Sequence, residues 1–231
     1  MLRRLTEVDR DLLTGDVAAV AQWLLGCHLY RSPDGRQRPD AGGIIVETEA
    51  YRGKGDSAAH SARGKTRSNA SMFGVAGTWY VYPIHSRYCV NLVTGEPNVG
   101  EAVLIRAIEP TLGIDAMARR RQTDHPRRLT SGPGMVCEAL AIDRAFDGID
   151  ALSAEASLWI ETDETPRSFD VVSSPRIGVT SAKALRLRYF VDGNRYVSGR
   201  ALDHNLPRRG QLSNCVAKWQ LGLSRNRKFT S

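Results

Sequence analysis

Apolar residues recur at intervals of three and four in the segment 17–24, which predicts a helix with its apolar side on the core. Asp16 is placed to cap this helix, and Gly26 suits the position just after its end. Residues 133–140 repeat the apolar spacing behind a Ser-Gly pair, so a second helix is expected there, with a proline in its first turn. A third helix is expected over 110–121.

Short runs rich in β-branched and aromatic residues predict the strands. They lie at 27–31, 43–51, 79–82, 103–108, 158–161 and 186–191. Strands and helices do not alternate regularly, as βαβ units would require. We therefore expect an α+β protein with a largely antiparallel sheet.

The composition is that of a globular protein, with 42% apolar and 25% charged residues in a chain of 231. The net charge of +7 suits a polyanionic partner such as nucleic acid. Most of the excess lies in the segment 200–231, where seven Lys and Arg residues stand against one Asp. We therefore expect one domain at 1–199 and a basic C-terminal extension at 200–231, which is either a solvated tail or a contact for phosphates.

Several functional classes lose support from the sequence. No apolar run approaches the roughly 20 residues that span a bilayer, and the N-terminus lacks the apolar segment of a secretory signal. The four cysteines lie far apart without a CxxC pair, which predicts buried free thiols in a reducing, cytoplasmic compartment. His60 and His85 have no third ligand at suitable spacing, so no metal site is expected. The absence of a heptad pattern favours a monomer.

Two glutamates lie on one face of the predicted strand 43–51. Because side chains alternate along a strand, Ile45, Glu47, Glu49 and Tyr51 should share a face, with the two carboxylates about 7 Å apart. Burial of unpaired carboxylates is costly, so this face must meet water, cations or a polar cleft. This face is either the solvated face of an edge strand, or it belongs to a rigid strand that holds a carboxylate beside an aromatic ring.

Tyr80 and Tyr82 share a face of the next predicted strand, where they either pack in the core or stack on a base. Between the two strands, residues 52–67 form a glycine-containing basic loop that includes Arg63 and Arg67. This loop is either mobile or approaches a phosphate backbone.

Arg106 lies in the middle of the predicted strand 103–108 among apolar neighbours. A charge in such a place needs a partner, and Glu47 or Glu49 is the candidate. The pair is either a structural ion pair or part of a site.

Several motifs occur in one order along the chain. They are Ile-Val-Glu-Thr-Glu-Ala-Tyr at 45–51, Ala-Ala-His-Ser at 58–61, Arg-Ser-Asn at 67–69, Gly-Thr-Trp-Tyr-Val-Tyr at 77–82, Val-Leu-Ile-Arg-Ala at 103–107, Ser-Gly-Pro-Gly at 131–134 and Arg-Ile-Gly-Val at 176–179. Over about residues 15–191 the chain thereby resembles the alkyladenine (3-methyladenine) DNA glycosylase family. The resemblance implies a single domain around a curved, barrel-like, mainly antiparallel sheet with peripheral helices.

The resemblance also implies a monofunctional glycosylase of base excision repair that needs no metal or cofactor. Its substrate is double-stranded DNA with an alkylated or deaminated purine of the 3-methyladenine, 7-methylguanine, hypoxanthine and ethenoadenine class. The damaged nucleotide is flipped into a pocket and its N-glycosidic bond is hydrolysed, which leaves an abasic site. The implied location is the cytoplasm, at the nucleoid, with no membrane partner.

By resemblance, Glu49 is the general base that activates water, and Arg106 helps to hold that carboxylate. Tyr51 and Tyr82 stack on the two faces of the flipped base. The other residues implied at the purine and its water are His60, Asn91 and Val179. Asn91 would disfavour undamaged guanine by a clash with its exocyclic amine.

The sequence departs from the family pattern in two places. After Tyr82, family members usually run Tyr-Gly-Met-Tyr before the Asn, whereas here the stretch 83–91 is Pro-Ile-His-Ser-Arg-Tyr-Cys-Val-Asn and is one residue shorter. The side chain expected to fill the gap left by the flipped base is His85, with Arg87 as the second candidate. Met135 stands where a lysine usually follows Ser-Gly-Pro, and we expect the segment 200–231 to restore the lost DNA affinity.

Two alternatives to an enzyme remain open. A non-catalytic damaged-DNA or nucleic-acid-binding module on the same fold would have no need of Glu49. A formyltransferase-like or tRNA-binding domain would prefer RNA and would also leave this carboxylate unused.

Overall fold

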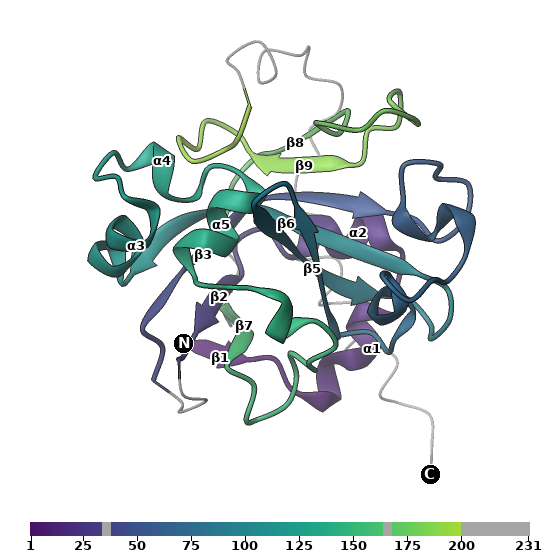
Figure 1. The fold of residues 1–231 in the computed structure, drawn as a ribbon, viewed down its shortest axis with the longest axis horizontal. Coiled ribbons are helices and arrows are strands. Elements are labelled where there is room, and N and C mark those ends of the chain that lie inside the picture. The colour runs from purple at the N-terminus through teal and green to yellow at the C-terminus, as the bar shows by residue number, and fades with distance from the viewer. Residues whose placement is uncertain (34–37, 164–167, 200–231) are drawn as a thin grey trace.

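The computed structural model describes residues 1–33, 38–163 and 168–199. These residues form one mainly antiparallel sheet of nine strands with short helices beside it (Figure 1). The sheet is curved but does not close into a barrel, so the predicted α+β class is confirmed. The basic extension expected at 200–231 lies outside the described residues.

The strands are β1 (Leu2–Arg4), β2 (His28–Arg31), β3 (Ala41–Tyr51), β4 (Trp79–Ile84), β5 (Arg87–Thr94), β6 (Glu101–Leu112), β7 (Leu158–Asp163), β8 (Val171–Ser174) and β9 (Arg188–Val191). The helices are α1 (Arg10–Leu13), α2 (Val17–Trp23), α3 (Ile114–Arg121), α4 (Arg127–Thr130) and α5 (Pro133–Ala139). Single 3-10 turns are η1 (Glu7–Asp9), η2 (His60–Arg63), η3 (Ala70–Phe73) and η4 (Arg144–Phe146).

Strand β3 is the centre of the sheet, whose order is β1-β7-β2-β3-β6-β5-β4. Its first half pairs with β2 and its second half with β9, while β6 runs along its other side. Strand β8 extends the sheet beyond β9, at the top of Figure 1. The segment with the two glutamates is therefore an interior strand, and the edge-strand interpretation is wrong.

Two opposed irregularities in β3 and β6 change the expected alternation of side chains. The register passes from Ile45↔Ile108 to Glu47↔Ala107, so Val46 is an extra residue in β3. Ile45 consequently packs in the main core, while Val46 packs with Ala107 on the opposite side. The prediction that Ile45 shares a face with Glu47 is therefore wrong, because a β-bulge shifts the alternation by one residue.

Local sequence accounts for the helices that pack on this sheet. Asp16 caps α2 by accepting a hydrogen bond from the amide of Ala19 at 2.9 Å, as predicted. The apolar side of α2 enters the main core, and α5 begins at Pro133 and packs against β5 and β6. Both predicted helices are confirmed.

The third predicted helix begins later than expected. Strand β6 continues to Leu112, and Gly113, at φ 72°, turns the chain into α3. Pro110 fits within the strand because the ladder is irregular opposite Gly43, where a Cβ would lie 2.2 Å from the carbonyl oxygen of Glu109. The expectation of a helix over 110–121 is thus wrong for its first four residues.

Two negative expectations can be compared with the described residues. Cys27, Cys89 and Cys137 are free and buried, as predicted, while Cys215 lies outside the described part of the chain. Among residues 1–33, 38–163 and 168–199, no helix is both long and apolar enough to cross a lipid bilayer.

Candidate active site

Strands β3 and β6 bring two buried glutamates to one buried arginine. Glu47 and Glu49 are fully buried, and Arg106 is 8% exposed. Arg106 is the extra residue of β6, since the register passes from Glu47↔Ala107 to Thr48↔Ile105. This bulge directs Arg106 to the glutamate side of the sheet, and its Nη1 lies 3.4 Å from Glu49 Oε1. The predicted partnership is confirmed, and it involves both glutamates rather than one.

Three groups hold the carboxylate of Glu49. Besides the Arg106 guanidinium, the amide of Ile177 donates to Oε1 at 2.8 Å and the hydroxyl of Tyr51 donates to Oε2 at 2.9 Å. Burial and the adjacent Glu49 raise the pKa of Tyr51, so this hydroxyl keeps its proton and acts as the donor. Burial opposes the charge of Arg106, but Glu49 and Glu47 outweigh it and raise the pKa of this guanidinium.

Glu47 has partners that sequence analysis did not find. Arg188 Nε donates to its Oε1 at 2.5 Å, and the amide of Ser198 donates to its Oε2 at 2.7 Å. Arg106 Nε lies 3.2 Å from the same Oε1. Both new partners are distant in the chain, so only the pairing of β9 with β3 could have indicated them.

Aromatic rings form a recess close to Glu49. It is lined by Tyr51, His60, Met72, Tyr80, Tyr82 and Asn91. The free volume is about 10 Å³, room for a single water molecule at most. The structure thus brings together four of the residues predicted to hold a base, but the space between them is too small for a purine.

His60 fills part of the space between these rings. Its ring lies edge-on to Tyr82 with centroids 4.4 Å apart, and its Nδ1 shares a hydrogen bond with the Tyr80 hydroxyl at 2.7 Å. Partial burial against the rings lowers the pKa of His60 and favours the neutral imidazole. The amide of Asn91 is fixed in turn, because its Nδ2 donates to the carbonyl of Tyr80 at 3.0 Å.

Arg176 supports the back of the recess. Its guanidinium lies 4.5 Å from the ring centroid of Tyr51 and binds both oxygens of Asp56 at 2.6 Å. The next residue, Ile177, is the one whose amide holds Glu49. Val179 lies two residues further along this loop and is half-buried, and its role at the water site stays a prediction.

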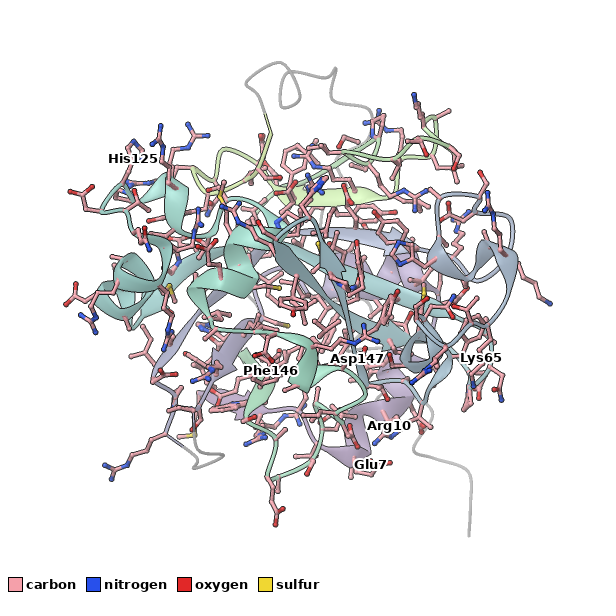
Figure 2. All side chains as sticks on the ribbon, viewed as in Figure 1. Glu7, Arg10, Lys65, His125, Phe146 and Asp147 are labelled. Carbon is pink, nitrogen blue, oxygen red and sulfur yellow. The ribbon has the colours of Figure 1, made fainter. Side chains whose placement is uncertain are left out.

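A larger cavity of about 720 Å³ opens beside the recess and shares three of its residues. Its walls include Arg63, Arg144 and Tyr88. Arg67 is exposed in the same loop region, and Figure 2 shows Lys65 at the edge of the molecule. Part of the basic loop therefore borders the opening, and its approach to a phosphate backbone stays a prediction.

The hairpin between β4 and β5 separates the two candidates for the duplex-filling side chain. His85 is exposed at the turn with φ 52°, next to Ile84, which is 41% exposed. Arg87 instead folds back onto α5, where its Nε lies 3.0 Å from Glu138 Oε2 and its side chain packs over Gly134.

The described residues contain no group of three or more His, Cys, Asp or Glu side chains that could hold a metal ion. What the site offers is a fixed carboxylate, an ordered arginine and an aromatic recess that adjoins a basic cavity. Such an arrangement can stabilise positive charge on a sugar, orient a water molecule and stack on a heterocyclic base.

Comparison with known proteins identifies the family. Residues 11–195 match the family described as methylpurine-DNA glycosylase. The chain belongs to the methylpurine-DNA glycosylase family. It is 50% identical over 200 residues to a protein from Rhodopirellula baltica, covering 84% of each chain. It is 44% identical over 189 residues to one from Methanoculleus marisnigri, covering 80% of this chain and 95% of the relative. Both relatives are provisionally named 3-methyladenine DNA glycosylases.

Proposed function

We propose that this protein removes damaged purines from double-stranded DNA by hydrolysis of the N-glycosidic bond. The observation that carries the proposal is the placement of Glu49, which is held by Arg106, Tyr51 and Ile177 at the edge of an aromatic recess. A protein that only binds damaged DNA has no need of a buried carboxylate fixed in this way. The family and the names of its relatives agree with this activity.

In the proposed reaction, Glu49 orients and deprotonates the water that attacks C1′ of the flipped nucleotide. The carboxylate also stabilises the positive charge that builds up on the sugar as the base leaves. The Ile177 amide and Arg106 both lie at Oε1, whereas Tyr51 is the one partner of Oε2, which leaves a lone pair of Oε2 for the water. General base assistance of this kind is worth roughly 10²–10⁴-fold in rate.

Recognition of the base falls to the recess. Tyr51 and Tyr82 stack on its two faces once His60 and Tyr82 separate, since the recess must widen to admit a purine. With Nδ1 of His60 bound to Tyr80, its Nε2 is the ring nitrogen left for a contact with the base. Asn91 excludes the exocyclic amine of guanine, and Val179 closes the side where the water lies.

The larger cavity receives the sugar and phosphates of the flipped nucleotide. Arg63 in its wall and Arg67 nearby supply positive charge for the backbone. His85, together with Ile84, enters the gap that the flipped base leaves, much as the wedge side chains of minor-groove-binding proteins enter a base step. The enzyme acts as a monomer on nucleoid DNA in the cytoplasm.

A lesion panel tests the proposal. Duplexes with a single hypoxanthine, ethenoadenine, 3-methyladenine or 7-methylguanine are incubated with the protein and then treated with alkali, which breaks the strand at abasic sites. We expect strand breaks that Glu49→Gln abolishes, while Glu96→Gln, an exposed loop variant, leaves them unchanged. Binding of lesion duplexes without breaks on the whole panel would instead support a binding module, and preference for RNA would support the tRNA-binding alternative.

A further inference from the structure

The guanidinium of Arg106 is shared unequally between two carboxylates. Its Nε lies 3.2 Å from Glu47 Oε1, whereas its Nη1 lies 3.4 Å from Glu49 Oε1. Nε also donates to the hydroxyl of Ser198 at 3.0 Å. Nε is therefore the more tightly held nitrogen, because it has both a hydrogen bond and the shorter ion-pair distance, whereas the nearest approach to Glu49 is at Nη1.

Glu47 and Ser198 form a clamp around that Nε. The Ser198 hydroxyl donates to Glu47 Oε1 at 3.0 Å, and its amide donates to Oε2 at 2.7 Å. Arg188 fastens the clamp from β9, donating to Glu47 at 2.5 Å and to the carbonyl of Ser198 at 2.9 Å. Neither Glu47 nor Ser198 lines the aromatic recess or the larger cavity, so neither is placed to touch a base or a phosphate.

Without this clamp, the guanidinium of Arg106 could pair with the carboxylate of Glu49 in a more favourable geometry. Guanidinium and carboxylate groups commonly pair through two parallel hydrogen bonds, which would occupy both oxygens of Glu49. A carboxylate paired in that way would have little capacity left to orient a water molecule or to stabilise a cationic sugar. The clamp prevents this pairing by holding Arg106 at its other side.

We propose that Glu47 and Ser198 are positioning residues that hold Arg106 by its Nε and so keep Glu49 available to the attacking water. The inference rests on the proposed glycosylase function and adds two residues to it. They act through Arg106 and not by contact with the substrate. In this arrangement Ser198, next to the last described residue of the chain, is part of what sets the activity of the site.

Ser198→Ala is the sharpest test, because it removes only the hydroxyl that bridges Arg106 and Glu47. Ser174→Ala is the matched control: this buried hydroxyl accepts from Arg188 Nη1 at 3.0 Å, in the same network, and makes no hydrogen bond to Arg106. The readouts are the single-turnover rate on a hypoxanthine duplex and the Kd for a duplex with a tetrahydrofuran abasic analogue. We expect Ser198→Ala to lower the rate roughly 3–10-fold without a change in Kd, and Ser174→Ala to change neither.

Glu47→Gln removes the charge of the clamp and keeps its shape. Nε of Arg106 then loses its carboxylate partner, and Arg106 is left to pair with Glu49. We expect the single-turnover rate to fall about 10²-fold, again without a change in Kd for the abasic-analogue duplex.

Conservative rescue and folding controls complete the design. Glu47→Asp, which keeps the charge, should recover part of the rate, and urea unfolding identifies any variant that is only destabilised. If the wild type cleaves the duplex, an unaltered rate in Ser198→Ala would overturn the inference. A loss of rate in Ser174→Ala equal to that in Ser198→Ala would overturn it as well. Absence of wild-type cleavage on every lesion contradicts the proposed function instead, so the two failures are distinct.

Discussion

The hydroxyl of Tyr51 donates a hydrogen bond to Oε2 of Glu49 at 2.9 Å, from a position two residues along the same strand. The ring proposed to stack on the base thus also orients the carboxylate proposed to activate water. Since the pKa of Tyr51 is raised, chiefly by burial, the donor stays protonated across the neutral range. Binding of the base and orientation of the catalytic group are coupled through one side chain.

Tyr51→Phe separates these two roles, because it keeps the ring and removes the donor. We expect the single-turnover glycosylase rate to fall roughly 10–100-fold, the worth of one hydrogen bond to a charged group, with little change in Kd for a lesion duplex. Tyr51→Ala should also weaken binding, since the stacking surface is lost. A Phe variant with weakened binding and a normal rate would contradict the assignment.

The sequence predicts those parts of the fold that depend on short-range patterns of residues. The Asp16 cap, the strand around Glu49 and the helix that begins at Pro133 all follow from short-range spacing, and the structure confirms them. Arg106 could be recognised as a charge in need of a partner because its neighbours are apolar. Each of these features depends on residues close together in the chain.

The features that were missed depend on strand register. The extra residues Val46 and Arg106 are bulges, and a bulge has no signature in an alternation of apolar and polar residues. The contacts of Glu47 with Arg188 and Ser198 span 141 and 151 positions in the chain, so they exist only once β9 has paired with β3. The Ile177 amide that holds Glu49 is a backbone group and left no trace in the side-chain pattern.

Asp56 links the aromatic recess to the pH dependence of stability. Burial alone would raise the pKa of this carboxyl, but its bonds to Arg176 and to the amides of Arg52 and Ala58 lower the pKa below the ordinary value of 3.8. A depressed pKa means that the pair stabilises the fold above pH 3.8 and that this contribution is lost as the pH falls through the folded-state pKa.

Asp56→Asn should therefore cost about 3–5 kcal/mol of unfolding free energy at pH 7, because Arg176 is left as an unpaired buried charge. The difference between wild type and variant should shrink below pH 3.8, where the wild-type carboxyl also becomes protonated. Urea unfolding at a series of pH values measures it, with the exposed Glu96→Gln as control. A difference that does not vary with pH would show that the charge of Asp56 is not the cause.

Substitutions of His85 and Arg87 in the β4–β5 hairpin should cause different DNA-binding defects. A side chain that fills the gap in the duplex acts only when a base is flipped, whereas a phosphate contact acts on all DNA. We expect His85→Ala to weaken binding to a lesion duplex roughly tenfold and to leave binding to undamaged duplex nearly unchanged. Arg87→Ala, which removes the ion pair with Glu138, should alter both affinities by the same small factor. Fluorescence anisotropy on the two duplexes measures this, and a lesion-specific loss in Arg87→Ala would reverse the assignment.

The basic segment 200–231 begins two residues after Ser198, beyond the residues that match the family. If its seven Lys and Arg residues bind phosphates and compensate for Met135, a chain that ends at Gly199 should bind lesion duplex more weakly at low salt. The slope of log K against log salt should become shallower by about 0.9 for each phosphate that the segment no longer neutralises, and the two chains should converge in affinity at high salt. Full-length protein with glutamine at the seven basic positions is the control for length, and it should behave as the shortened chain does. Ser198 is retained in the shortened chain and in the glutamine variant. The single-turnover rate of each at saturating enzyme should therefore stay at the wild-type value. An unchanged salt slope would assign the segment a role other than DNA binding.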